Sequence, residues 1–294
     1  MPELPEVETM RRGVLPVVGS RIASAERPPC KKRPILFQPR IDAFDRRVRD
    51  QAIVDIGRRG KRVMFHLQND QTLVIEPRMT GLVLLSDPPG EEHLRLRLRL
   101  VGGPNRQLLF WDRRGLGTVR LLTSTQLHEQ IDARLGVDAL DLSDVHLRDR
   151  LIRSRREIKV ALLDQAVVAG IGNLYAAEIL FLSGIDPRTR CDRLSRAQYQ
   201  RITEATSLVL REAIEHEGST LSDGTYRNAL NGEGGYQNYH RVYDRAGEPC
   251  PRCRNAKIQR IVQGQRSTFF CPNCQRKRGL HDSVAPLESS GRQT

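Results

Sequence analysis

The sequence of 294 residues lacks any run of about 18 apolar residues, so no membrane-spanning helix and no membrane partner are expected. Its acidic start also lacks the basic and then apolar pattern of a secretory signal, which predicts a cytoplasmic protein. No internal repeat is present. Hydrophobic residues make up 38% of the chain and charged residues 28%, a balance typical of a globular protein rather than a disordered one.

Lysine is also scarce: six of the 48 lysine and arginine residues are lysines. An isolated lysine at a motif position is therefore informative, because an amine can do chemistry that a guanidinium cannot. The net charge of +13 favours a polyanionic partner such as nucleic acid, because each neutralised phosphate releases a bound counterion. A solvated basic surface is the alternative explanation of the same charge.

Cysteines are few and unevenly placed. Cys30 and Cys191 stand alone, and we assign them no role. The other four form two C-x2-C pairs, Cys250 with Cys253 and Cys271 with Cys274. This spacing predicts one tetrahedral zinc in a reduced compartment rather than a disulfide framework. Because protein thiolates fill all four positions, the metal should be structural, and the stretch between the pairs predicts a hairpin that turns at Gly264.

The first half of the chain, from about residue 19 to 123, has a β pattern. In "HLRLRLRL" the leucines at positions 94 to 100 alternate with arginines, which is the signature of a half-buried strand. We expect Arg95, Arg97 and Arg99 to form a solvated outer face. Many antiparallel strands in one block predict a sandwich or barrel.

The second half turns helical, and "IKVALLDQAVVAGIGNLYAAEIL" predicts a helix, a tight turn and a second helix. Gly170 and Gly172 give the turn backbone freedom, and Asn173 can cap the second helix. The free N–H groups of that helix could bind a phosphate; a plain glycine turn between core helices is the alternative. Residues 219–240 form a long glycine-rich loop, a type of segment that is often functional.

The chain starts with "MPELPEVET", and residues 3–17 are predicted to be helical. Pro5 suits a first helical turn, and Glu3, Glu6 and Glu8 suit the positive end of a helix dipole. None of these preferences explains why a proline stands at position 2.

Three motifs, in order and well separated, resemble those of the formamidopyrimidine-DNA glycosylase family, which also includes the endonuclease VIII type. They are "PELPEVET", "GIGNLYAAE" and the four-cysteine ribbon with "QRSTFFC". The resemblance covers nearly the whole chain. It implies an α+β fold: an N-terminal helix with an antiparallel β-sandwich, then a helical domain with a helix–two-turn–helix motif and a zinc-ribbon hairpin. We expect a catalytic domain at 1–130, a helical domain at 131–240, a zinc finger at 241–278 and a disordered tail at 279–294.

The resemblance implies a bifunctional base-excision repair enzyme, a DNA glycosylase and AP lyase that flips a damaged nucleotide out of duplex DNA. After removal of Met1, Pro2 carries a free secondary amine that forms a Schiff base with the sugar, and β,δ-elimination nicks the strand. Glu3 matches the general acid and base, and Glu6 matches a second carboxylate that organises the site. Lys61 and Arg266 match a lysine and a ribbon arginine that bind phosphates near the lesion.

Further residues match DNA-binding positions of the family. They are Met79, Arg114 and Leu116, which would fill the vacated base stack, Lys159 and Asn173 at the helix pair, and Tyr236 at the end of the glycine-rich loop. Two positions depart from the usual motif. Arg113 replaces a proline and Gly115 replaces an arginine, which puts strict selection of cytosine opposite the lesion in doubt.

The long loop favours oxidised purines, 8-oxoguanine and formamidopyrimidines, as substrates. An endonuclease VIII-type enzyme for oxidised pyrimidines is one alternative. A non-catalytic zinc-ribbon protein that binds damaged DNA is another, although it would not need a free proline beside Glu3. We expect a monomer that holds one structural zinc ion and binds damaged double-stranded DNA.

Overall fold

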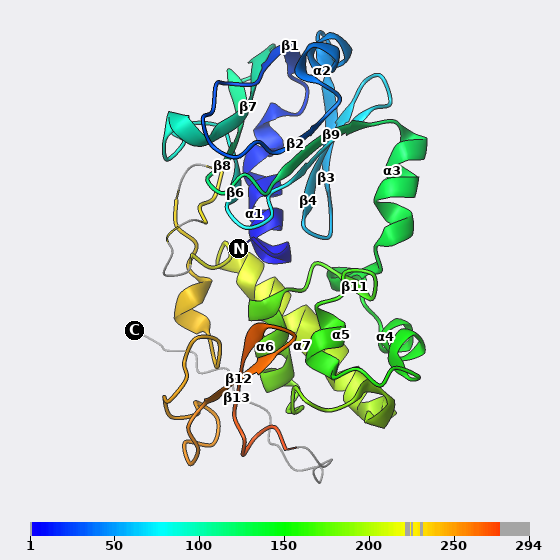
Figure 1. Ribbon diagram of the computed structural model, residues 1–294, viewed down its shortest axis with the longest axis vertical. Coiled ribbons are helices and arrows are strands. Elements are labelled where there is room, and N and C mark those ends of the chain that lie inside the picture. The colour runs from blue at the N-terminus through cyan, green and yellow to red at the C-terminus, as the bar shows by residue number, and fades with distance from the viewer. Residues whose placement is uncertain (1, 221–223, 225, 230–231, 277–294) are drawn as a thin grey trace.

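The computed structural model describes residues 2–220, 224, 226–229 and 232–276 (Figure 1). The predicted tail at 279–294 lies outside these residues, as do Met1 and parts of the glycine-rich loop. Two sheets and the first helix occupy one end of the molecule, and the helices from α4 (Asp144–Leu151) to α7 (Arg196–Glu215) with a small ribbon occupy the other (Figure 1). None of the described helices is both long and apolar enough to cross a membrane.

Two sheets build the N-terminal half. The four-stranded sheet has the order β1-β7-β8-β6. Its strands are Arg21–Glu26 (β1), Gly81–Leu84 (β6), Leu94–Val101 (β7) and Gln107–Asp112 (β8). The five-stranded sheet has the order β2-β9-β5-β4-β3. Its strands are Leu36–Gln38 (β2), Ile53–Arg59 (β3), Arg62–Leu67 (β4), Thr72–Glu76 (β5) and Thr118–Leu122 (β9). All neighbours are antiparallel except β2 and β9.

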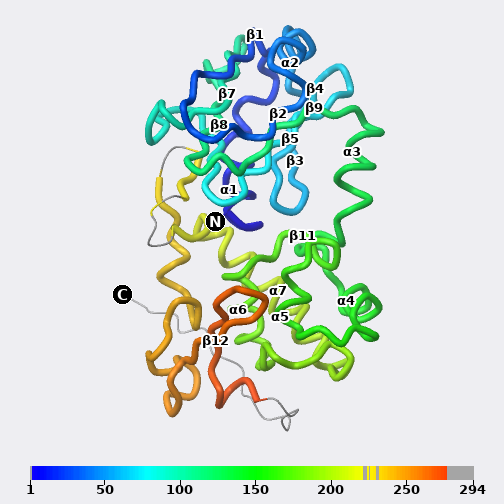
Figure 2. Tube along the Cα trace, in the orientation of Figure 1, coloured from blue at the N-terminus to red at the C-terminus, as the bar shows by residue number. Residues whose placement is uncertain are grey.

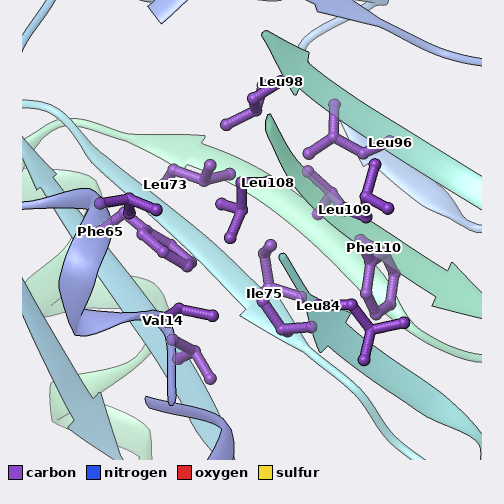
Figure 3. Packing of buried hydrophobic residues seen from close by; sticks show 14 of the residues in the cluster. Val14, Phe65, Leu73, Ile75, Leu84, Leu96, Leu98, Leu108, Leu109 and Phe110 are labelled. Atoms are coloured by element: carbon purple, nitrogen blue, oxygen red, sulfur yellow. The ribbon is translucent and has the colours of Figure 1, made fainter. Parts of the chain in front are cut away.

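The predicted sandwich core is present between the sheets. Figure 3 shows leucines of β7 and β8 packed together with residues of β4, β5 and α1 (Leu4–Val14). The leucines of β7, which occupy every second position, are all buried, because every second side chain of a strand points to the same face. A helix that the β pattern did not predict, α2 (Ile41–Val48), interrupts this half and buries Phe44 and Val48.

The expectation of a solvated arginine face on β7 is wrong for Arg95. The side chain of Arg95 is only 3% exposed, whereas Arg99 is exposed. The register with β8 shifts between Leu94 and Leu96, and such a bulge re-aims the side chain at that point. Arg95 is buried against Cys30 and Arg33 of the preceding loop, and it donates from Nε to the carbonyl oxygen of Asp112 at 2.9 Å.

The C-terminal half is mainly helical. Its helices are α3 (Ser124–Gln130), α4 (Asp144–Leu151), α5 (Ile158–Leu162), α6 (Asn173–Leu182) and α7 (Arg196–Glu215). Two short parallel strands, β10 (Val137–Asp138) and β11 (Val168–Ala169), pair between them. Helix α6 is apolar almost all round and nearly every residue of it is buried, so it forms the centre of this half.

The two cysteine pairs flank an antiparallel hairpin of β12 (Gln259–Gln263) and β13 (Arg266–Phe270), as predicted. Gly264 occupies the turn with a positive φ of 52°. Strand β13 lies against α6, and the ribbon forms a small third core with residues of that helix.

Helix α1 joins the two halves. Its Leu4 packs in the helical core, whereas Val7, Met10 and Val14 pack in the sandwich core. The tube in Figure 2 places the N-terminal end of this helix at the boundary between the halves. The start of the chain therefore lies where both halves can contribute side chains to one site.

Candidate active site and nucleic-acid interface

The start of α1 is held in place by hydrogen bonds to the start of α6, which lies much later in the chain. Pro2 is buried, and the adjacent Glu3 is 3% exposed. The Glu3 carboxylate accepts hydrogen bonds from the backbone N–H groups of Leu174, at 3.0 Å, and Tyr175, at 3.4 Å. These belong to the first turn of α6, whose N–H groups have no partner within the helix and favour a negative charge.

The two turn glycines make this contact sterically feasible. A Cβ atom on Gly172 would lie 2.2 Å from the carboxyl carbon of Glu3, and one on Gly170 would lie 2.5 Å from a methyl carbon of Leu4. Gly170 also has a φ of +112°, and its carbonyl oxygen accepts from the N–H of Leu4 at 3.1 Å. The two glycines of the motif "GIGN" therefore leave the space into which the start of α1 packs.

Two expectations about this turn need correction. The first-turn N–H groups of α6 are not all free for a phosphate, because Glu3 takes two of them. Asn173 does not cap the helix either: Gly172 occupies the N-cap position. The Asn173 side chain instead accepts from Lys159 and donates to the carbonyl oxygen of Ser267, at 3.0 Å.

Glu6 lies beneath Glu3 in a fully enclosed position. Its carboxylate accepts from the Tyr175 hydroxyl at 2.5 Å, the Glu3 N–H at 2.8 Å and the Ser219 N–H at 2.9 Å. Burial, followed by repulsion from Glu3, raises the pKa of Glu6. Burial and the neighbouring Glu6 charge likewise raise the pKa of Tyr175 well above its usual value. Glu6 thus ties α1 to α6 and to the start of the glycine-rich loop.

Tyr175 is a site residue that the sequence analysis missed. It stands inside the quoted motif "GIGNLYAAE", but nothing in a local pattern shows that its hydroxyl reaches a residue 169 positions earlier. An aromatic residue in an apolar helix is ordinarily part of a core, and only the position of α1 gives its hydroxyl a carboxylate partner.

The predicted cationic residues gather around these carboxylates. Lys159 is fully buried on α5, and its Nζ donates to Asn173 Oδ1 at 2.6 Å and to the Ser267 carbonyl oxygen at 3.4 Å. Burial, reinforced by the nearby charge of Arg266, lowers the pKa of Lys159 to about 8. Arg266 itself is exposed at the start of β13. Lys159, Asn173 and the ribbon are therefore one hydrogen-bonded unit.

Lys61 lies in the tight turn between β3 and β4. Burial lowers its pKa, while the charges of Glu3 and Glu6 act in the opposite direction. Asp138 of the helical half holds this turn: its Oδ2 accepts from the Gly60 N–H at 2.9 Å and from Arg58 Nη1 at 2.7 Å. Asp138 is a second residue that the sequence analysis did not single out, and it holds the turn that carries Lys61 against β10 of the helical half.

Two loops of the sandwich carry the residues predicted to fill a base stack. Met79 lies between β5 and β6, and Arg114 and Leu116 lie between β8 and β9. The Arg114 side chain is exposed, whereas Met79 and Leu116 are half-buried. Asp112 connects the two loops by hydrogen bonds to residues of both. The sequence analysis did not identify this residue.

Asp112 is fully buried and organises both loops. Its carboxylate accepts from the Thr80 hydroxyl at 2.5 Å and from the N–H groups of Arg114, at 3.2 Å, and Gly117, at 2.7 Å. The Thr80 hydroxyl oxygen in turn accepts from the Arg114 N–H at 2.9 Å. Gly115, the departure from the family motif, has a φ of +64°, and a Cβ there would lie 2.4 Å from the Arg33 carbonyl oxygen.

The prediction that Tyr236 contacts DNA needs correction for its side chain. Tyr236 is fully buried, its ring lies 5.8 Å from that of Tyr175, and its hydroxyl accepts from Arg241 at 3.1 Å. The side chain therefore has no surface to offer a ligand. The described parts of residues 219–240 also pack on the sandwich, since Leu85 N–H donates to the Ala229 carbonyl oxygen at 3.1 Å.

The four paired cysteines meet in space as their spacing predicts. The Sγ atoms of Cys250, Cys253, Cys271 and Cys274 all lie within 4.8 Å of one another. Cys250 and Cys274 are 3.8 Å apart, and Cys253 and Cys271 are 3.7 Å apart. Zinc–sulfur bonds of about 2.3 Å in a tetrahedron place sulfurs about 3.8 Å apart, so this cluster fits a structural zinc ion.

Family models match the chain in three consecutive segments. They are the formamidopyrimidine-DNA glycosylase N-terminal domain at residues 1–119, the formamidopyrimidine-DNA glycosylase H2TH domain at 135–225, and a zinc finger found in FPG and IleRS at 247–276. The chain is 41% identical over 283 residues to the formamidopyrimidine-DNA glycosylase of Chloroflexus aggregans, covering 94% of this chain and 98% of that protein. It is 36% identical over 283 residues to the one from Streptococcus mutans, covering 94% and 100%.

Solved structures give the same result. The MutM (Fpg) protein from Thermus thermophilus superposes with a TM-score of 0.82 and 35% identity, covering 95% of this chain and 100% of that one. Lactococcus lactis Fpg in complex with DNA containing an abasic site superposes with a TM-score of 0.81 and 33% identity, covering 94% and 100%.

Proposed function

This chain belongs to the formamidopyrimidine-DNA glycosylase family, and from that premise we propose how its own residues divide the work. It is a base-excision repair enzyme, a DNA glycosylase for oxidised purines with AP-lyase activity. The observation that carries the assignment of residues is the anchoring of the chain's start. Glu3, next to Pro2, is held on the first turn of α6, with Glu6 beneath it and Lys61 close enough to sense both charges.

In the proposed first step, the amine of Pro2, freed by removal of Met1, attacks C1′ of the flipped nucleotide. The bond from nitrogen to C1′ forms as the glycosidic bond breaks, and the base leaves with its bonding electrons and a proton. An α-amino group titrates near pH 8, so a useful fraction is neutral at physiological pH. Glu3 protonates the sugar ring oxygen as the ring opens, which leaves an iminium ion between Pro2 and C1′.

The iminium ion acidifies the hydrogen on C2′, and when this proton is lost the 3′ phosphate is expelled. A second elimination then expels the 5′ phosphate. Glu6 positions Glu3 through the Glu3 N–H rather than touching the substrate. Lys61, Asn173 and Arg266 bind the phosphates that flank the lesion, which positions the backbone without reading sequence. The buried Lys159 holds the Asn173 side chain in place and attracts the phosphates through its charge rather than by direct contact. Met79, Arg114 and Leu116 fill the vacated stack, with Arg114 facing the opposite base.

Borohydride trapping tests this assignment. Mature enzyme incubated with a duplex containing 8-oxoguanine opposite cytosine should form a covalent complex, and mass spectrometry should place the adduct on Pro2. Replacing Pro2 by glycine should reduce trapping and nicking at least about tenfold, because a secondary amine forms the iminium directly. Pro5→Ala is the matched control, since Pro5 lies within α1 and carries no free amine. DNA binding without trapping or nicking would favour a non-catalytic damage-binding protein.

The purine preference is tested by rates on different lesions. Of the described residues in this segment, Ser219 binds Glu6 and Ala229 binds the sandwich, which supports a cover for a flipped purine. Faster removal of thymine glycol than of 8-oxoguanine from duplex DNA would favour the endonuclease VIII type. Because Gly115 replaces an arginine beside Arg114, we propose relaxed selection of the opposite base, to be measured as the ratio of rates opposite cytosine and adenine.

We further propose that the enzyme acts as a monomer in the cytoplasm and that residues 1–130, 131–240 and 241–278 are its three units. The zinc thiolates support a reducing compartment. Sedimentation of the enzyme with and without DNA tests the monomer, since a dimer on one lesion site would double the sedimenting protein mass.

A further inference from the structure

A cavity lies on the sandwich, away from the carboxylates of the active site. It has a volume of about 240 Å³ and is lined by residues of the segment 27–34 together with Leu94 and Arg95 of β7. Cys30 is part of that lining, and its thiol is half-buried. The proposed DNA repair reaction uses neither Cys30 nor this cavity.

Arg95 supplies the polar wall of the cavity. Its Nη1 donates to Cys30 Sγ at 2.9 Å and to the Arg33 carbonyl oxygen at 2.9 Å, and its Nε donates to the Asp112 carbonyl oxygen. Its Nη2 is buried and finds no partner among the described residues. A buried donor without a partner costs free energy, so the present contacts do not fully satisfy the Arg95 guanidinium.

The two unpaired cysteines of this chain have contrasting surroundings. Burial raises the pKa of Cys191 to about 11, and its side chain is fully enclosed. Cys30 instead borders open volume, donates to the Glu92 carbonyl oxygen at 3.0 Å and accepts from a guanidinium. Thiols that are accessible and next to a cation are the ones that oxidants reach.

We propose that Cys30 is an oxidation site for small hydroperoxides, in which the Arg95 guanidinium, which already donates from Nη1 to the sulfur, binds the oxygen added to it. The sulfur attacks one oxygen of the peroxide; the S–O bond forms as the O–O bond breaks, and the sulfur loses two electrons. With hydrogen peroxide, the other oxygen leaves as hydroxide and takes the thiol proton, so the products are a sulfenic acid and water. The cavity provides room for the peroxide and for the added oxygen.

The modification would act on the loop that carries Arg114. Arg95 also holds the carbonyl oxygens of Arg33 and Asp112, and the backbone of Gly115 packs directly on the Arg33 carbonyl. A guanidinium drawn toward the oxidised sulfur gives up part of those bonds, which loosens the loop. This step rests on the proposed role of Arg114 at the opposite base, whereas the oxidation itself does not.

The oxidation is tested without DNA. The zinc-loaded enzyme is treated with hydrogen peroxide and then with a sulfenic-acid probe of the dimedone type, and labelling is mapped by peptide mass spectrometry. We expect at least about tenfold more label at Cys30 than at Cys191, and a several-fold loss of that label in Arg95→Gln, with zinc retained. Equal labelling of the two cysteines, or labelling of Cys30 that does not change in Arg95→Gln, would overturn the proposal.

The consequence is tested with DNA. Wild-type enzyme and Cys30→Ser, each before and after peroxide, are compared in single-turnover nicking of 8-oxoguanine opposite cytosine and opposite adenine. We expect peroxide to lower the cytosine-to-adenine rate ratio about threefold or more in the wild type only. An unchanged ratio in a labelled wild-type enzyme overturns the coupling to the loop. Loss of nicking in untreated Pro2→Gly reports on the proposed function separately.

Discussion

The pKa of Lys159 shows how strongly the surroundings of a buried amine affect its protonation. It is enclosed by α5, α6 and β13, where its ammonium group holds Asn173 Oδ1 and the Ser267 carbonyl oxygen. Desolvation favours the neutral amine, and the Arg266 charge acts in the same direction. The result is a lysine that loses its proton within an accessible pH range, unlike an exposed lysine near pH 10.4.

This shift predicts a pH dependence of DNA affinity. As pH rises through about 8, Lys159 becomes neutral and its attraction for phosphate is lost, so affinity for a duplex with an uncleavable abasic-site analogue should fall. Between pH 7 and 9 at constant salt, we expect the wild type to lose about fivefold more affinity than Lys159→Met, equivalent to about 1 kcal/mol. The exposed Lys257→Met is the matched control and should keep the wild-type profile; identical profiles for all three would contradict the assignment.

The lowered pKa of Lys159 changes the free energy of unfolding with pH in the opposite direction to the DNA affinity. The unfolded chain binds more protons than the folded one between pH 8 and the unfolded lysine pKa, so this group's contribution to the free energy of unfolding rises with pH across that window. Affinity and stability should therefore move in opposite directions above pH 8, which separates loss of the attraction for phosphate from unfolding.

At the scale of elements, we expect the glycine positions of the "GIGN" turn to tolerate no side chain, because the start of α1 packs directly against them. Gly172→Ala would place a Cβ 2.2 Å from the Glu3 carboxyl carbon, so the carboxylate must leave the first turn of α6. We expect single-turnover nicking to fall about 100-fold or more, since a small misplacement of a catalytic group can cost that much. Gly102→Ala is the control: its φ of +78° makes alanine strained, but the space around it is open, so its melting temperature should drop while nicking persists.

The zinc ribbon is an element that the metal should hold in place. Two-stranded hairpins are only marginally stable in water, and β13 supplies both Arg266 and the Ser267 carbonyl that binds Lys159. Chelation of zinc, or Cys271→Ser, should therefore lower DNA affinity at least about tenfold while the helical circular dichroism signal is retained. Cys30→Ser should keep both zinc and affinity. Full affinity in a zinc-free protein would show that the ribbon does not need the metal.

At the scale of the whole molecule, the net charge of +13 and the cations around the site predict salt-dependent binding. The slope of log affinity against log salt should become shallower by about one unit in Lys61→Gln and in Arg266→Gln, because each removes one phosphate contact. Arg49→Gln is the matched control, since Arg49 is the C-cap residue of α2, and Figure 1 shows α2 at the opposite end of the molecule from the ribbon of β12 and β13. Equal slopes in all variants would place the phosphates elsewhere.

Much of this organisation is legible in the sequence. Alternating leucines indicate β7, two C-x2-C pairs indicate the zinc ribbon, and three ordered motifs indicate the family. These signals depend on spacing within a short stretch, which the periodicities of strands and helices and the geometry of metal ligands translate directly into structure. The predicted roles of the site residues and the domain boundaries stay predictions.

Other features depended on packing that no local pattern encodes. Glu3 finds its partners 171 positions later on α6, Tyr175 reaches back to Glu6, and Asp112 joins two loops separated by three strands. Arg95 is buried against the sequence expectation because Cys30 and Arg33, more than 60 positions earlier, contact its guanidinium at a point where the register of β7 shifts. Composition and local spacing are enough to predict which chemical groups this protein has and which elements carry them. Which buried polar groups meet depends on how the whole chain packs, because each needs a partner that distant segments bring into hydrogen-bond range.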